Sequence, residues 1–523
     1  MKINSICIVG GGSSGWMTAA ALSKNFPNID FTLVESDINP VGVGESTLGS
    51  FNRFLRYLGL EDKDWMPHCN ATYKTSIAFK NFREGNGERF QYPFGDYVTE
   101  YDTNFIYYLR HHYPEFYPPE EAARFINFQT FLAESNRFTN DGIEGTTYNS
   151  KKNVAYHFDA ALFGKFLKEK IAIPNGVKYF NDKISYCTKD EKGNIKALHT
   201  DKGNSFTADL FIDCTGFKSL LLGKFMGVPF KDYSDWLFND TALATQIPYI
   251  EKNEQMRSWT DCIAMSNGWV WEIPLWNRIG TGYVFSSKYI TPEDAEVEYR
   301  DFLSKQHSKE IADKAKFKLI KIRHGRHDNA WEKNVVGVGL SYGFIEPLES
   351  TGLMTTHENI LTLGDILSNI NNNVVGQKDR DLLNYYINSL TDSMMVFVNM
   401  HYYLSSRSDN LYWEDCINNK SFFEKKDRFN TKLEYQIDDF LELGGAKWFN
   451  SSKAGDITIA LGQGINPVTK RIYNEAIEDD NFLSDLEATH EKYQKMKKEL
   501  LERLDLLPTH FEYLKNNIYG GYS

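Results

Sequence analysis

Cysteine pairs are missing from this chain of 523 residues. Its six cysteines stand singly, and no two of them have the Cys-x-x-Cys spacing of zinc sites and redox motifs. We therefore expect neither a disulfide framework nor a bound metal. Unpaired thiols favour a reducing, cytoplasmic location.

Long apolar runs, basic clusters and internal repeats are missing too. No apolar run reaches the roughly 20 residues that a membrane-spanning helix needs, so we expect a soluble protein. The formal net charge is −12 without a basic cluster, which argues against nucleic acid as a partner. The first predicted strand begins within a few residues of Met1, which leaves no room for a signal peptide.

Aromatic residues, in contrast, are abundant. The chain has 36 Phe, 30 Tyr and 10 Trp, which make up 15% of its residues. Such an excess is typical of a ring-rich core and also of a pocket for flat ligands. Composition alone favours the core.

A glycine-rich turn follows the first predicted strand, residues 5–9. Gly10, Gly12 and Gly15 fit the pattern G-x-G-x-x-G. In that pattern the first glycine permits a tight turn, the second lets a pyrophosphate approach the backbone, and the third lets the next helix pack on the strand. The helix predicted to begin near Ser14 would point its N-terminus at the phosphates.

An acidic residue closes the second predicted strand, residues 31–34. Glu35 follows Gly15 by 20 residues, where a carboxylate would accept hydrogen bonds from the hydroxyls of an adenosine ribose. A glycine motif by itself is also compatible with a purely structural turn. Strand, helix and acid in this register predict a dinucleotide-binding βαβ unit.

Two later strand ends favour FAD over NAD. The predicted strand 209–213 ends in the small-residue turn Cys214-Thr215-Gly216, which suits the nucleotide half of a flavin. The predicted strand 335–340 carries Gly339-Leu340-Ser341 at its end, which suits the pyrophosphate or ribityl chain. No second G-x-G-x-x-G follows a later strand, so an NADPH-binding domain is not indicated.

Further motifs resemble those of the flavin-dependent halogenases of the tryptophan-halogenase family, from residue 5 to about 413. They include Trp16 in the glycine-rich opening, the loop 42–47, the W-x-W-x-I-P segment 269–274 and the loop 344–352. The resemblance implies a mixed α/β fold: a Rossmann-like FAD-binding module of the flavin monooxygenase type with an interwoven β-sheet. It also implies a mostly helical C-terminal substrate module.

The domain organisation follows from the same resemblance. We expect an FAD-binding halogenase core over residues 1–400, with substrate-side insertions at about 50–150. We expect a helical substrate or cap module over residues 401–523. The flavin contacts expected from the motifs are Gly10, Gly12, Ser13, Ser14, Gly15, Glu35, Gly44, Glu45, Ser46, Thr47 and Leu340.

The resemblance also assigns catalytic roles. Reduced FAD, oxygen and a halide (chloride, bromide or iodide) would give hypohalous acid. Lys74 would then donate a hydrogen bond to that acid or form a haloamine with it. Glu349 would stabilise the cationic ring intermediate and accept its proton. Thr351 and Gly352 would hold the halide through backbone N–H groups.

Two nearby residues are alternatives to this assignment, and the substrate motifs depart from the family. Lys80 and Glu346 stand close to the assigned lysine and glutamate but outside the matching frame. The tryptophan-specific members place a His-x-Phe pair on the indole, whereas this chain has Tyr92 and Phe94 at that position. Trp448, with Glu442, is a loose counterpart of their C-terminal clamp.

We therefore predict halogenation of an electron-rich aromatic other than free tryptophan: an indole, phenol, pyrrole or aniline. A separate flavin reductase would supply FADH2, and the sequence allows a homo-oligomer. Two other functions stay open. One is a flavin-dependent aromatic hydroxylase, which normally needs an NADPH interaction. The other is a non-catalytic FAD-binding redox module, which would bind flavin without giving a halide-dependent product.

Overall fold

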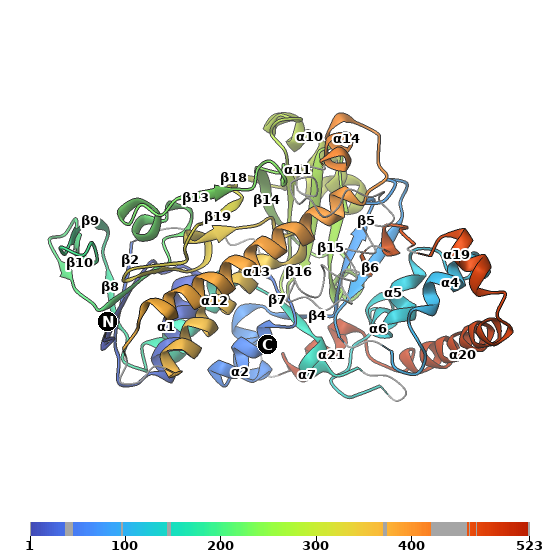
Figure 1. Ribbon diagram of the computed structural model, residues 1–523, viewed down its shortest axis with the longest axis horizontal. Coiled ribbons are helices and arrows are strands. Elements are labelled where there is room, and N and C mark those ends of the chain that lie inside the picture. The colour runs from blue at the N-terminus through green and yellow to red at the C-terminus, as the bar shows by residue number, and fades with distance from the viewer. Residues whose placement is uncertain are drawn as a thin grey trace. The chain divides into compact units, whose positions relative to one another are not determined.

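The computed structural model describes residues 2–36, 45–95, 98–143, 148–369, 374–419, 458–459, 461–466 and 468–520 (Figure 1). The chain forms two compact units, each built from three segments. Unit 1 consists of Met1–Ala71, Phe158–Leu237 and Ile322–Met395, and unit 2 of Thr72–His157, Phe238–Lys321 and Val396–Ser523. Helix α13 (Gln377–Tyr403) contains the last boundary. The predicted division at residue 400 stays a prediction.

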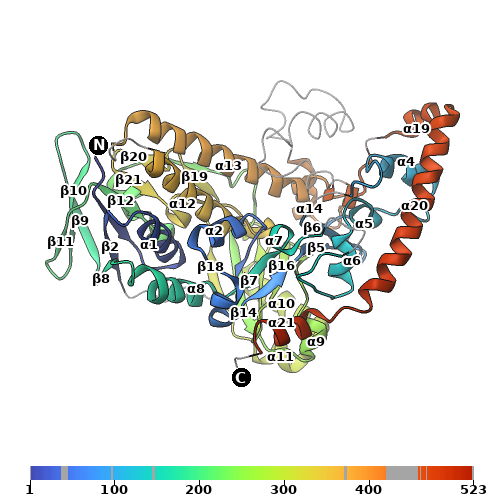
Figure 2. The same ribbon diagram turned by 90° about the horizontal axis from the view of Figure 1, so that it is seen from below.

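Unit 1 contains a six-stranded sheet in the order β20-β21-β12-β1-β2-β8. Figure 2 labels β20, β21, β12, β2 and β8 of this sheet. Its strands are β1 (Ser5–Val9), β2 (Asp30–Glu35), β8 (Lys178–Asn181), β12 (Leu210–Asp213), β20 (Trp331–Glu332) and β21 (Val335–Gly337). All neighbours pair in parallel except β20 and β21. Residues of β12 and β21 are buried throughout, as expected for parallel strands covered on both faces.

Small residues bring the first helix close to this sheet. Helix α1 (Ser13–Asn25) buries Ala19, Ala20 and Ala21. It packs against α8 (Ala160–Leu167) and α12 (Thr351–Asn369). The predicted strand–glycine turn–helix–strand unit is confirmed.

The other elements of unit 1 are short, and one strand prediction was wrong. They are β3 (Glu45–Ser46), α2 (Phe51–Leu58), α3 (Asp62–Trp65), η1 (Pro67–Cys69), η2 (Lys168–Ala172), β9 (Ile184–Lys189), β10 (Ile195–Thr200), β11 (Ser205–Phe206), η3 (Gly216–Lys218), η4 (Leu220–Phe225), β13 (Phe230–Asp232), β19 (Gly325–His327), η5 (Gly339–Ser341), β22 (Gly343–Phe344) and η6 (Pro347–Glu349). The strand predicted over 335–340 ends at Gly337, because Gly339 takes a left-handed φ of 70° and opens η5.

Unit 2 contains a seven-stranded sheet in the order β18-β14-β17-β16-β15-β5-β6. Its strands are β5 (Ser76–Lys80), β6 (Arg89–Pro93), β14 (Thr241–Ile247), β15 (Trp259–Ala264), β16 (Gly268–Pro274), β17 (Ile279–Phe285) and β18 (Lys318–Lys321). A further pair joins β4 (Thr72–Lys74) and β7 (Ala155–Phe158) antiparallel. The described helices are α4 (Phe105–His112), α5 (Glu121–Ile126), α6 (Gln129–Glu134), α7 (Ser150–Asn153), α9 (Lys252–Gln255), α10 (Pro292–Gln306), α11 (Lys309–Lys314), α14 (Leu411–Asn418), α19 (Lys470–Ala476), α20 (Asp480–Leu504) and α21 (His510–Asn517).

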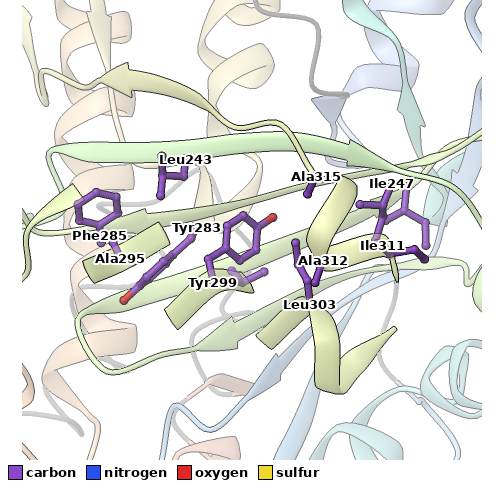
Figure 3. Close-up of a cluster of buried hydrophobic side chains, with 12 residues drawn as sticks. Leu243, Ile247, Tyr283, Phe285, Ala295, Tyr299, Leu303, Ile311, Ala312 and Ala315 are labelled. Atoms are coloured by element: carbon purple, nitrogen blue, oxygen red, sulfur yellow. The ribbon is translucent and has the colours of Figure 1, made fainter. Parts of the chain in front are cut away.

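One face of this sheet carries an apolar core. Tyr283 and Leu243 from the sheet pack with Tyr299 and Leu303 from α10, as Figure 3 shows. Each of these side chains is at most 4% exposed. Much of the aromatic excess therefore serves the core, as composition alone favours. The mixed α/β fold class is confirmed.

The two tryptophans of the W-x-W-x-I-P segment are also buried. Trp269 and Trp271 share a face of β16, with ring centroids 6.2 Å apart. Trp271 stands opposite Gly282 on β17, and a Cβ atom at Gly282 would overlap the Trp271 ring. The glycine thus makes room for the indole to lie across the neighbouring strand.

Candidate functional site

Three loops of unit 1 meet at one edge of the parallel sheet. They follow β1, β12 and β21, whose carboxyl ends lie on the same side because the strands are parallel. The Cys214 N–H donates to the Val9 carbonyl (2.8 Å), and the Val338 N–H donates to the Asp213 carbonyl (2.9 Å). The structure therefore brings together the three loops that the sequence predicts as flavin contacts.

The glycines of the first loop differ in their surroundings. A Cβ atom at Gly10 would overlap the Cys214 carbonyl, and one at Gly15 would overlap the Gly10 carbonyl. A Cβ atom at Gly12 would meet no atom within 4 Å. Open space at the second glycine, before the N-terminus of the 13-residue helix α1, is what a pyrophosphate cradle requires. The loop fits the phosphates of a dinucleotide.

Glu35 lies against the same loop, held by a lysine that the sequence analysis missed. A Cβ atom at Gly11 would overlap the Glu35 carboxylate. Lys168 Nζ is 3.2 Å from Glu35 Oε1 and 3.5 Å from the centre of the Tyr179 ring. It also lies 4.8 Å from the Trp16 ring. No sequence motif marks Lys168, because its partners come from three separate segments.

The predicted serines and Leu340 lie next to these loops. Ser13 Oγ donates to the Ala160 carbonyl (3.1 Å), which joins α1 to α8. A Cβ atom at Gly339 would overlap Ser14 Oγ, so the loop after β21 touches the start of α1. Leu340 is 38% exposed beside this contact.

The predicted segment 45–47 is linked to the predicted halide loop. Ser350 Oγ donates to Ser46 Oγ at 3.0 Å, and Thr47 is buried. Burial raises the pKa of Glu45 to about 7, and the charge of Asp159 adds to the effect.

The loop predicted to hold the halide turns sharply into a long helix. Ser350 has a left-handed φ of 59° between η6 and the 19-residue helix α12. Thr351 Oγ1 donates to the Glu346 carbonyl at 3.3 Å, and a Cβ atom at Gly352 would meet no atom within 4 Å. Glu349 is fully buried. Open space before backbone N–H groups at a helix start suits an anion.

Lys74 is the candidate catalytic residue of unit 2. It ends β4 and is 0% exposed, so it is not an ordinary solvated lysine. Its Nζ lies 5.0 Å from the centre of the Phe94 ring, within cation–π range. Lys80, the alternative, is only partly buried. The structure thus brings together Lys74 and Phe94, which the sequence analysis named for separate reasons.

A neutral histidine lies near Lys74. Thr72 Oγ1 donates to the Pro274 carbonyl (2.6 Å), so it accepts from His157 Nδ1 (3.3 Å). His157 Nε2 is then free to accept from Thr260 Oγ1 (2.9 Å). Burial, followed by the charge of Lys74, holds the pKa of His157 well below its usual value. No motif in the sequence marks His157, because its partners Thr72 and Thr260 lie far away in the chain.

Phe94 is fixed by the residue next to Lys74. The Phe94 N–H donates to the Thr75 carbonyl at 3.0 Å. Gln129 Nε2 donates to the same carbonyl (2.8 Å) and to the Asn153 carbonyl (2.7 Å). The Tyr92 ring meets the Phe94 ring edge to face, with centroids 6.0 Å apart. Tyr92 and Phe94 therefore form one aromatic surface beside the lysine.

Three candidates lie outside the described residues: Gly44, Glu442 and Trp448. Among the residues that the structure describes, no helix is long and apolar enough to cross a membrane. Over the same residues, no group of three or more His, Cys, Asp or Glu side chains could hold a metal ion. The cytoplasmic location stays a prediction.

Comparison with known proteins extends over nearly the whole chain. The family model described as tryptophan halogenase matches residues 5–478. The 7-chloro-L-tryptophan 6-halogenase KtzR of Kutzneria sp. (strain 744) is 37% identical over 426 residues, or 78% of this chain and 81% of that protein. The VirX1 apo structure has a TM-score of 0.90 at 45% identity and covers 99% of this chain and 100% of its own. The tryptophan 6-halogenase SttH of Streptomyces toxytricini has a TM-score of 0.83 at 29% identity, covering 98% and 99%.

Proposed function

The chain belongs to the tryptophan halogenase family, and on that basis we propose that it uses reduced FAD, oxygen and a halide to halogenate an electron-rich aromatic compound. The complete burial of Lys74 beside the Phe94 ring is the observation that carries this proposal. A lysine without a catalytic or structural task would be expected at the surface. Membership of the family makes the chain a flavin-dependent halogenase.

The flavin would be held by unit 1, and when bound it supplies the activation of oxygen. The open backbone at Gly12 would receive the pyrophosphate. Glu35 would accept hydrogen bonds from the adenosine ribose. The remaining proposed contacts are Gly10, Ser13, Ser14, Gly15, Gly44, Glu45, Ser46, Thr47 and Leu340.

The halide would bind at the start of α12. Backbone N–H groups at Thr351 and Gly352 are suited to an anion that must give up part of its water. Bromide and iodide hold their hydration shells less strongly than chloride, so their desolvation costs less. We therefore expect turnover with halides larger than chloride.

Lys74 would direct the hypohalous acid onto the substrate. Its ammonium donates a hydrogen bond to the oxygen of the acid and makes the halogen more electrophilic. The substrate ring attacks the halogen, the oxygen–halogen bond breaks, and the oxygen takes a proton from Lys74 to leave as water. Glu349 accepts the ring proton, and proton transfer through solvent restores both side chains. A haloamine at Lys74 is the other form that this step can take.

The substrate would be an aromatic compound other than free tryptophan. By their names, the relatives KtzR and SttH act on 7-chloro-L-tryptophan and on tryptophan. This chain carries Tyr92 and Phe94 where tryptophan-specific members have a His-x-Phe pair. Two packed aromatic rings suit a flat indole, phenol, pyrrole or aniline. Trp448 stays a proposed third contact.

The test is a panel of such aromatics with free tryptophan, each incubated with chloride, bromide or iodide and a separate flavin reductase. Mass spectrometry should find halogenated product on compounds other than tryptophan, and none without the reductase or the halide. Efficient chlorination of tryptophan alone would contradict the substrate proposal. Hydroxylated product without halide would instead favour an aromatic hydroxylase, and flavin binding without any product would favour a redox module.

A further inference from the structure

The strand that carries Lys74 has a strand neighbour on one edge and a side chain on the other. β4 pairs with β7 through Thr72, Tyr73 and Lys74. Successive residues of a strand turn their backbone groups to opposite edges. The Tyr73 N–H accordingly donates to His510 Nε2, at 3.2 Å. This imidazole comes from the first residue of α21 and takes the place of a neighbouring strand.

The second ring nitrogen of His510 is occupied as well. His510 Nδ1 lies 3.0 Å from the Met256 carbonyl oxygen. A carbonyl can only accept and a backbone N–H can only donate, so Nδ1 carries the proton and Nε2 does not. His510 is therefore neutral and joins two backbone segments, at Tyr73 and at Met256.

The same two segments also bond to each other directly, two residues after Tyr73 and Met256. The Thr75 N–H donates to the Ser258 carbonyl at 2.6 Å. Segment 256–258 therefore runs beside β4. At one end His510 bridges Met256 to Tyr73, and at the other Ser258 bonds directly to Thr75. Lys74 stands between the bridged position, Tyr73, and the directly bonded position, Thr75.

Helix α21 also covers the face of β4 that is opposite to Lys74. The Tyr73 ring stacks on the Phe138 ring with centroids 4.4 Å apart, and Tyr513 meets both rings. Successive side chains of a strand point to opposite faces. Helix α21 therefore fixes the face of β4 on which the Tyr73 side chain lies. Because neighbouring side chains alternate, this also sets the face to which the Lys74 side chain points.

We propose that His510 is a positioning residue for Lys74, holding β4 in the register and rotation that aim the lysine at hypohalous acid. This inference rests on the proposed role of Lys74. His510 lies beyond residue 478, where the match to the family model ends. The last described helix is thus part of the catalytic scaffold, although the match to the family model ends before it.

The experiment compares His510→Leu with the full-length wild type, using bromide, a separate flavin reductase and an accepted aromatic substrate. Three quantities are measured: reduced flavin oxidised, brominated product, and hypobromous acid released, which is trapped with monochlorodimedone. We expect product per flavin oxidised to fall roughly 10- to 100-fold, the size of effect that misplacing a reacting group produces. Released hypobromous acid should rise while the rate of flavin oxidation stays unchanged.

Matched variants separate positioning from simple loosening of α21. His510→Gln offers an amide oxygen to the Tyr73 N–H and should recover part of the product yield. It also provides the test if His510→Leu does not fold. Glu512→Ala removes the carboxylate that accepts the Thr509 N–H in the capping box at the start of α21, and it should leave the product yield unchanged. A yield in Glu512→Ala as low as in His510→Leu would overturn the proposal.

Lys74→Ala identifies which proposal has failed. If it abolishes product while both His510 variants keep the wild-type yield, the positioning role is wrong and the role of Lys74 stands. If Lys74→Ala keeps its product, the role of Lys74 is wrong and the inference about His510 falls with it. In the Lys74→Ala background, His510→Leu should release no additional hypobromous acid, because both changes act through one lysine.

Discussion

The two units carry their candidate residues on different kinds of backbone. In unit 1 the candidates Gly10, Gly12 and Leu340 follow parallel strands, where Gly10 and Gly339 have a left-handed φ. In unit 2 the candidate Lys74 ends strand β4: His510 bonds the backbone of Tyr73 before it, and Ser258 and Gln129 bond the backbone of Thr75 after it. Unit 1 would present backbone N–H groups to a cofactor, whereas unit 2 presents one desolvated side chain.

This difference separates two ways of losing function. A loop site depends on empty space beside the backbone, so one added side chain removes it. A strand site depends on remote partners, so it is lost when a partner changes.

The largest effect is expected within the glycine loop of unit 1. Gly15→Val forces a side chain into the Gly10 carbonyl and should cost about 3 kcal/mol or more of unfolding free energy. Gly12→Val meets only open space, so the fold should persist while FAD affinity is lost. Thermal unfolding and flavin titration of both variants check this. Normal FAD affinity in a folded Gly12→Val protein would contradict the cofactor assignment.

Acid should act on unit 2 through His510, which is fully buried. Burial lowers its pKa from 6.5 to about 4. The unfolded chain therefore binds a proton there below about pH 6.5 and the folded chain only below about pH 4. The unfolding free energy should fall by about 3 kcal/mol as pH drops through this window. Urea unfolding across the window should show a shallower slope in His510→Leu; an equal slope would contradict the prediction.

Unit 1 should respond to pH in the opposite direction through Glu45. Its pKa of about 7 lies above the usual 4.5. The carboxyl therefore ionises in the unfolded chain first, and its contribution to stability is lost as pH rises from 4.5 through 7. Glu45→Gln should remove this loss. The readout is the unfolding midpoint of wild type and variant at pH 5 and pH 8, and an identical pH dependence in both would contradict it.

Space beside a strand also matters in unit 2, at Gly282. An alanine there would overlap the Trp271 ring, so Gly282→Ala should cost about 1–3 kcal/mol. Trp271→Phe removes the overlapping ring, so Gly282→Ala should cost less unfolding free energy in that background. A double-mutant cycle on the unfolding free energy would show this. Additive costs would mean that the packing of Trp271 on Gly282 has been misread.

The smallest effect is expected for Lys168. Lys168→Met keeps the apolar stem but removes the ion pair with Glu35 and the charge over Tyr179. Partly exposed pairs of this kind contribute up to about 1 kcal/mol, so FAD affinity should fall a few-fold. Lys170→Met, which changes an exposed lysine of the same turn, is the control. Equal affinities for both variants would show that Glu35 needs no such support.

The sequence predicted more of unit 1 than of unit 2. The reason is the same difference between a site on loops and a site on a strand. A backbone that must approach phosphates needs glycines at fixed spacing, so Gly10, Gly12 and Gly15 can be recognised as candidates from the sequence. The family resemblance supplied Lys74, but neither spacing nor composition indicates that it is buried. His157, Lys168 and His510 act through partners distant in the chain, and a single sequence does not record such contacts.

The central claim is that Lys74 acts on an oxidant that is made without it. The most direct test measures reduced flavin oxidised and halogenated product formed by wild type, Lys74→Ala and the control Lys80→Ala. We expect Lys74→Ala to lose product by at least about 100-fold, the scale of removing a catalytic proton donor. Its flavin oxidation should match that of wild type and of Lys80→Ala. Halogenated product at the wild-type rate from Lys74→Ala would contradict the account.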